Sequence, residues 1–185
     1  QCFTNSIVKS TKGNTTAICP AWDTYDVHQV LLHNARLLPN RHDNIGPCAH
    51  TSSILYRRSQ KIIPEWAKSC FIGDEPLFVA VAETGKSKFL NEIMTVYRAG
   101  VGISSKNFSL ERDFENRIRM YHIMNSGTHF RYRRTINTII ATLNLNYSKL
   151  LWKTKRKKHS IKCLTNSILS DHRVVFNWFL RTKVH

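Results

Sequence analysis

The sequence predicts an α/β domain with a mixed sheet, followed by a helical C-terminal subdomain. Segments that are rich in β-branched and aromatic residues and are bounded by turn formers predict strands. These segments are 2–8, 15–19, 52–57 and 87–97. Segments whose apolar residues recur at helical spacing predict helices at 26–38 and 76–84. After Ser105 the apolar pattern is helical throughout, so we expect two parts, 1–105 and 106–185.

Charge separates the same two parts. The formal net charge of the 185 residues is +16. From Asn116 onward there are 15 Lys or Arg and one acidic residue, Asp171, whereas residues 1–115 hold 13 basic and 11 acidic residues. The basic excess therefore belongs to the C-terminal part, and its partners are a separate question from any chemistry in the first part.

Composition limits the class of protein. No run of 18 apolar residues occurs, so we expect no transmembrane helix, and the N-terminus lacks a signal-peptide pattern. The cysteines show no C-x-x-C and no zinc-ligand spacing, so we expect reduced thiols in a cytoplasmic protein, with a Cys2–Cys19 disulfide as the alternative. The chain opens at Gln1, and we expect a fragment or a processed form.

The N-terminal elements have ordinary signals. A turn at 11–14 lies between the first two expected strands, which suits a hairpin. The expected helix at 26–38 has an apolar face, and Thr24 or Asp26 suits its N-terminus. His28 and His33 lie on this helix, and we expect surface or half-buried side chains rather than metal ligands.

The stretch 71–98 holds the acidic residues best placed for chemistry. Pro76 suits the first turn of a helix, so Glu75 is expected near the N-cap and Asp74 just before it. Gly85 is expected to end that helix in a left-handed conformation. The helix dipole favours an ionised carboxylate here, and such a group suits a general base or a metal ligand. The alternative is that both acids only cap the helix.

Four pieces of sequence in a fixed order carry a resemblance to a known family. They are HTSSILYRR (50–58), IPEW (63–66), GDEPLFVAVAETGK (73–86) and the strand that ends in VYR (96–98). Together they resemble the C-terminal half of a family 2 glycosyltransferase domain, over residues 1–105. The resemblance implies a partial GT-A fold and an inverting enzyme, often bacterial, that transfers a sugar from a nucleotide-sugar to a hydroxyl of a polysaccharide, lipopolysaccharide or capsule glycan.

The resemblance also implies roles for single residues. Asp74 would be the catalytic base, and Arg98 a phosphate contact. The acceptor-binding residues would be Glu75, Thr51, Ser52 and Trp66. Structural alternatives stay open for three of these residues. Thr51 and Ser52 would instead be strand-edge residues, and Trp66 a core side chain.

The chain departs from the family at two places. The family commonly continues the Tyr-Arg pair with a histidine two residues on, whereas Tyr97–Arg98 is followed here by Ala99–Gly100. The donor-binding half, with its D-x-D-type acidic motif, has no counterpart in the chain. A divalent cation (Mg²⁺ or Mn²⁺) is therefore expected for the complete enzyme only, and this piece alone is expected to be inactive.

The C-terminal part reads as helices with a basic segment. Apolar periodicity predicts helices over 107–124 and 131–151, and shorter apolar patches predict one or two terminal helices. The basic run beside Trp152 suggests peripheral contact with the inner face of a membrane. Its residues are Lys153, Lys155, Arg156, Lys157 and Lys158. A solvated linker and a nucleic-acid patch are the alternatives.

Two classes of function therefore stand side by side. The first is a glycosyltransferase whose donor half is missing. The alternative is a non-enzymatic basic module that binds an anionic membrane surface or nucleic acid. Because the resemblance covers only half of a sheet, we also expect an exposed sheet edge and self-association of the chain alone.

Overall fold

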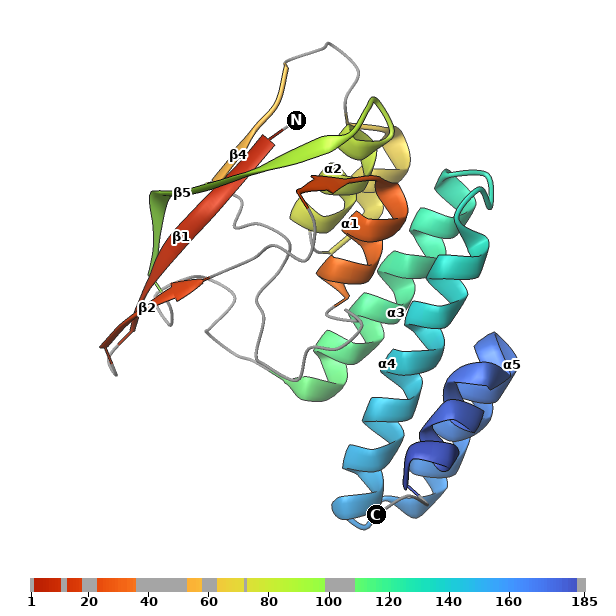
Figure 1. The fold of residues 1–185 in the computed structure, drawn as a ribbon. Coiled ribbons are helices and arrows are strands. Elements are labelled where there is room, and N and C mark those ends of the chain that lie inside the picture. Colours follow the sequence, from red (N-terminus) through yellow and green to blue (C-terminus); the bar gives the residue numbers. More distant parts are fainter. Residues whose placement is uncertain are drawn as a thin grey trace. The chain divides into compact units, whose positions relative to one another are not determined.

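The computed structural model separates into two compact units, residues 1–110 and 111–185. The residues whose structure is described are 2–10, 13–17, 23–35, 53–57, 63–71, 73–98 and 109–182. The first unit mixes strands and helices, and the second is helical (Figure 1). The mixed α/β class expected from the sequence is confirmed, with the change to purely helical structure at 110–111.

A mixed sheet organises the first unit. β1 (Cys2–Ser10) and β5 (Ser87–Arg98) pair in parallel, and β1 also pairs antiparallel with β2 (Gly13–Ala17). Short strands β3 (Thr24–Tyr25) and β4 (Ile54–Leu55) pair antiparallel with β5 and β1. The strand order is β2-β1-β5-β3, with β4 also on β1.

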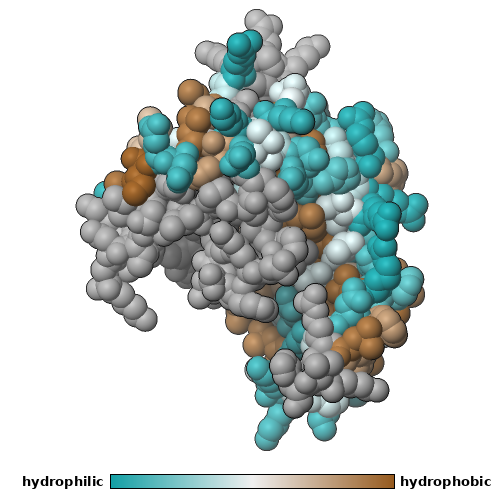
Figure 2. Space-filling model, in the orientation of Figure 1, coloured by the Kyte–Doolittle hydropathy of each residue, from teal (hydrophilic) through white to brown (hydrophobic). Residues whose placement is uncertain are grey.

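Only the first part of β5 is covered. Ser87 and Phe89 are buried while Lys88 between them is exposed, which is the alternation of a half-buried strand. From Asn91 onward, where the pairing with β1 shifts register, no described side chain of β5 is buried, and Ile93 and Met94 are 51% and 62% exposed. Hydrophobic atoms accordingly show at the upper left of Figure 2, where β4 and β5 run in Figure 1.

Helix α1 (Val27–Asn34) begins with a reciprocal cap. The Gln29 N–H donates to Asp26 Oδ1 at 2.8 Å, and the Asp26 N–H donates to Gln29 Oε1 at 2.9 Å. This capping box satisfies two backbone donors and explains why the helix begins here. The N-terminal prediction is confirmed, but the helix ends at Asn34, before the expected residue 38. His28 is exposed, and the side chain of His33 lies outside the described residues.

The helical unit contains α3 (Leu110–Gly127), α4 (Arg133–Lys153) and α5 (Lys157–Thr182). All three predicted helical regions are confirmed, with ends shifted by two or three residues for α3 and α4. Asp171 is not helical (φ −160°, ψ 96°), so α5 is two helices that meet at this residue. In Figure 1 the second half of α5 turns back alongside the first.

Small polar residues join α4 to the first half of α5. The Ser148 and Ser160 hydroxyls donate to each other's backbone carbonyls at 2.9 and 2.8 Å. The Ser167 hydroxyl donates to the Ala141 carbonyl at 2.7 Å. Ser148 pairs with Ser160, and the earlier residue Ala141 pairs with the later residue Ser167, so the two helices are antiparallel. Because their side chains are small, the two backbones approach closely, and each buried hydroxyl has an acceptor.

Candidate functional site

Asp74 and Glu75 are the first two residues of α2 (Asp74–Ala82), and Gly73 is the N-cap. The expected positions, with Glu75 at the N-cap and Pro76 in the first position, are therefore wrong by two residues. The reason is local: Gly73 has helix-like angles (φ −84°, ψ −25°) and provides no side-chain cap. Asp74 Oδ1 instead accepts the Glu75 N–H at 3.0 Å, so this carboxylate satisfies one free backbone donor of the first turn.

The helix that presents Asp74 is fixed by burial. Phe78 and Val79 are almost fully buried, and every residue from Phe78 to Ala82 is buried. Glu75 is also buried, at 6% exposure, whereas Asp74 is half-buried. Asp74 is thus the carboxylate of the pair with surface open to a ligand. Gly85, expected as a left-handed C-cap, lies two residues beyond the C-cap Glu83 with φ 157°, in the turn that leads to β5.

The other residues given roles by the resemblance are scattered or outside the description. Trp66 lies in the short helix η2 (Glu65–Ser69) and is half-buried. Arg98 is exposed and ends β5, on the uncovered half of that strand. Thr51 and Ser52 lie outside the described residues. The structure therefore gives no shared site that unites Asp74 with these residues, and their roles stay predictions.

The helical unit contains a groove that the sequence did not predict. It has a volume of about 920 Å³ and is lined by α3, α4 and the first half of α5. Its apolar lining includes Phe114, Ile118, Ile140, Tyr147, Leu151 and Leu169. The Phe114 and Tyr147 rings stack with centroids 4.1 Å apart. Apolar residues at helical spacing on α3 and α4 were visible in the sequence, but which of them face a groove depends on where α5 packs.

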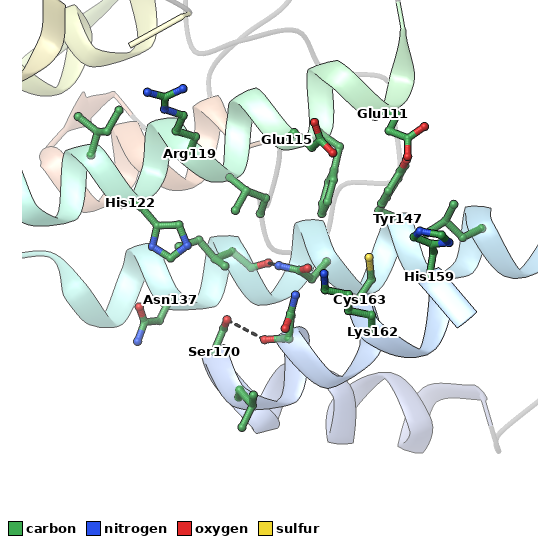
Figure 3. A pocket seen from close by; sticks show the side chains of 18 of the residues that line it. Glu111, Glu115, Arg119, His122, Asn137, Tyr147, His159, Lys162, Cys163 and Ser170 are labelled. Atoms are coloured by element: carbon green, nitrogen blue, oxygen red, sulfur yellow. Dashed lines mark hydrogen bonds between the residues drawn. The ribbon is translucent and has the colours of Figure 1, made fainter. Parts of the chain in front are cut away.

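Charged groups gather at one end of the groove. In Figure 3, Glu111, Tyr147 and His159 lie together at one end, whereas His122, Asn137 and Ser170 lie at the other. The Arg156 guanidinium donates to both carboxylate oxygens of Glu111, at 2.9 and 3.2 Å. This hydrogen-bonded pair lowers the pKa of Glu111. The pair ties the start of α3 to the turn before α5.

Burial shifts the pKa of two side chains that line the groove. Burial raises the pKa of the Cys163 thiol, so the reactive thiolate is disfavoured at neutral pH. Burial also raises the pKa of Tyr147, with Glu111 adding to the effect. Within the described residues, no three His, Cys, Asp or Glu side chains are grouped to hold a metal ion. The groove is an apolar surface with a charged rim.

The basic run predicted from the sequence forms the end of α4, a short turn and the start of α5. Its side chains are all exposed. Arg156 differs from its neighbours because its guanidinium is held by Glu111. The Lys157 ammonium lies 5.8 Å from the centre of the Trp152 ring, within range of a weak cation–π contact.

In the ranges that the structure describes, no helix is both long and apolar enough to span a membrane. Cys2, Cys70 and Cys163 are free thiols, and Cys19 lies outside the described residues. A scan against protein-family models finds no match to the chain, and searches against curated proteins and solved structures find none either.

Proposed function

We propose that the chain is the acceptor-side half of an inverting glycosyltransferase, with Asp74 as the catalytic base. The observation that carries this proposal is the placement of Asp74 on the first turn of a buried helix, with part of its side chain open to solvent. The hydrogen bond from the Glu75 N–H restricts rotation of the carboxylate. The order of strands and helices in the first unit is the order expected from the sequence.

In the proposed reaction Asp74 accepts the proton of an acceptor hydroxyl. The acceptor oxygen, as it loses this proton, attacks the anomeric carbon of the donor sugar and forms a new C–O bond. The bond from that carbon to the nucleoside diphosphate breaks on the opposite face, and the nucleoside diphosphate leaves. The configuration at the anomeric carbon is inverted. A base acts over hydrogen-bond distance, so the acceptor hydroxyl must approach to about 3 Å of the carboxylate.

Apart from the predicted phosphate contact of Arg98, donor binding is assigned to no residue of this chain. A divalent cation would balance the diphosphate charge in the complete enzyme. The sequence has no D-x-D motif, and the described residues hold no cluster of acidic or imidazole ligands. The residues that the structure describes therefore do not fit a cation site.

The test is Asp74→Asn in the protein that carries this chain together with a donor-binding half. The asparagine side chain keeps a carbonyl oxygen that can accept the Glu75 N–H, so the variant keeps this contact and loses the base. We expect transfer to fall by about 10²- to 10⁴-fold, with donor binding unchanged. Activity is measured as sugar transfer and donor binding by calorimetry.

A matched control is Asp26→Asn, because Asp26 also accepts a backbone N–H at a helix N-terminus. We expect this variant to keep transfer near the unsubstituted level. Full transfer activity in Asp74→Asn would contradict the assignment of Asp74 as the catalytic base. Equal losses in both variants would show that both aspartates act through helix stability.

The alternative function is a basic, non-enzymatic binding module. The exposed lysines at the α4–α5 turn favour it as a second candidate. It predicts binding of an anionic partner that weakens steeply with salt and does not depend on Asp74.

A further inference from the structure

One end of the helical unit combines exposed apolar side chains with lysines. At the end of α4, Trp152 is 55% exposed. We define the basic end by residues from the end of α4, the following turn, the start of α5 and the last part of α5. They are Trp152, Lys153, Lys155, Lys157, Lys158, Phe179 and Leu180.

Phe179 and Leu180 reach this end because α5 reverses at Asp171. The Lys149 ammonium lies 4.5 Å from the centre of the Trp178 ring, which places the last part of α5 beside the last part of α4. Figure 1 shows the second half of α5 returning toward the α4–α5 turn. Phe179 and Leu180 follow Trp178 directly and are 48% and 50% exposed. Three large apolar side chains thus stand half-exposed at one end of the unit.

The C-terminal part of the chain has few acidic residues to balance the lysines of the basic end. From residue 116 to the C-terminus the single acidic residue is Asp171. Asp171 is buried and accepts hydrogen bonds from Arg173 and Thr138. Glu111, at the start of α3, is held by Arg156. Asp113 in α3 is held by Arg117, and no ion pair of the described residues includes any of the four lysines, so their charge is available to an anion from outside the chain.

We propose that the basic end docks on an anionic membrane surface. Lysines would lie among the lipid phosphates while Trp152, Phe179 and Leu180 enter the headgroup region. Indole rings favour this depth because they pair an apolar body with one N–H donor. Half-exposed aliphatic and aromatic groups gain from leaving water there, whereas a duplex nucleic acid offers them no apolar layer. The proposal does not depend on the transfer reaction.

The test is binding of the full chain to vesicles of phosphatidylcholine alone and mixed with phosphatidylglycerol, measured by co-sedimentation at about 0.1 M salt. We expect binding to the anionic vesicles only. Each lysine near an anionic surface contributes about a fivefold gain in affinity, so Lys157→Gln with Lys158→Gln should weaken binding by about 25-fold. Both positions begin a helix, where loss of a positive charge favours the fold.

The matched control is Arg133→Gln with Arg134→Gln. These residues are exposed and begin α4, so the substitution removes the same charge at an equivalent helix position. We expect less than about a threefold loss, because long-range attraction is screened within about 10 Å. Equal losses in the two pairs would overturn the proposal in favour of diffuse attraction to the whole basic unit.

A second substitution separates a membrane from a nucleic acid. Trp152→Ser with Leu180→Ser keeps every lysine, and we expect it to weaken binding to anionic vesicles by about tenfold. Binding to a DNA duplex, measured by fluorescence anisotropy, serves as the comparison. Tighter binding to DNA than to vesicles, with no effect of this variant on either, would overturn the membrane assignment and support a nucleic-acid partner. Far-UV circular dichroism confirms that each variant is folded.

Discussion

Helix α4 and strand β5 differ in how completely they are buried. In the helical unit, α4 and the first half of α5 meet through a stripe of small and apolar residues, and the buried hydroxyls of Ser148, Ser160 and Ser167 all have carbonyl acceptors. In the sheet unit, β5 is covered over its first part, but its last part exposes Ile93 and Met94.

This difference identifies the outer part of β5 as an apolar surface that the rest of the described chain leaves uncovered. An uncovered run of apolar side chains on a strand is a surface suited to contact with further elements or with a partner. The helical unit shows no such stretch along α4, where exposed positions are mainly polar. That the first part is half of a domain stays a prediction. Self-association of the chain stays a prediction, tested by sedimentation.

The largest expected effect contrasts one apolar side chain from each unit. Leu145 is 4% exposed and lies one helical turn from Ala141 and about one from Ser148, on the face of α4 that meets α5. Leu145→Ala should lower local stability by about 2–4 kcal/mol through lost burial and a cavity. Ile93→Ala, on the exposed part of β5, should cost less than about 0.5 kcal/mol. Hydrogen exchange of peptides from each unit measures both effects.

A large loss of stability in Ile93→Ala would contradict the expected difference between the two substitutions. Such a result would mean that the outer part of β5 is covered in solution, for example by a second copy of the chain. Repeating the exchange over a range of protein concentrations distinguishes the two cases, because cover by a second copy weakens on dilution.

The next effect concerns the reversal inside α5. Asp171 accepts hydrogen bonds from Thr138 Oγ1 at 2.7 Å and from Arg173 Nε and Nη2 at 2.8 and 2.7 Å. These bonds hold the pKa of Asp171 at about 2, with Arg173 the largest cause. We expect Asp171→Asn to destabilise the helical unit by about 1–2 kcal/mol at neutral pH, measured by urea unfolding.

The pH dependence has a definite sign. The folded-state pKa is below the ordinary value of 3.8, so the contribution of Asp171 is present above that value and is lost as the pH falls toward 2. The difference between the original chain and Asp171→Asn should close over this window. Asp113→Asn is the control, because Asp113 pairs with Arg117 on a more exposed surface. A constant difference from pH 6 to pH 2 would contradict the assigned role of the charge.

The sequence predicted the elements better than their ends. Hydrophobic periods located α3, α4 and the long strand β5, because each is long and strongly patterned. Asp171 lies between two apolar patches that were expected to form one or two helices, and its hydrogen bonds to Thr138 and Arg173 explain the break. The first turn of α2 was misplaced because Gly73 adopts helix-like angles without a capping side chain, a choice that local sequence does not encode.

The candidate sites could be predicted only in part. Asp74 was singled out by its place before a buried helix, and the structure keeps that position within two residues. The groove of the helical unit was missed because it depends on the packing of three helices, which periodicity alone does not fix. The engagement of Arg156 by Glu111 was also missed, since 45 residues separate the two in the chain.

The smallest expected effect tests whether surface charge adds to the stability of the helical unit. Glu111 and Arg156 form a two-pronged ion pair, but both side chains are more than two-fifths exposed. Solvent and salt screen such a pair, so Glu111→Gln should shift the thermal midpoint by less than about 1 °C. Differential scanning calorimetry at low and high salt measures the shift. A drop as large as that of Asp171→Asn would mean that the end of the groove, rather than the buried stripe between α4 and α5, holds the helices together.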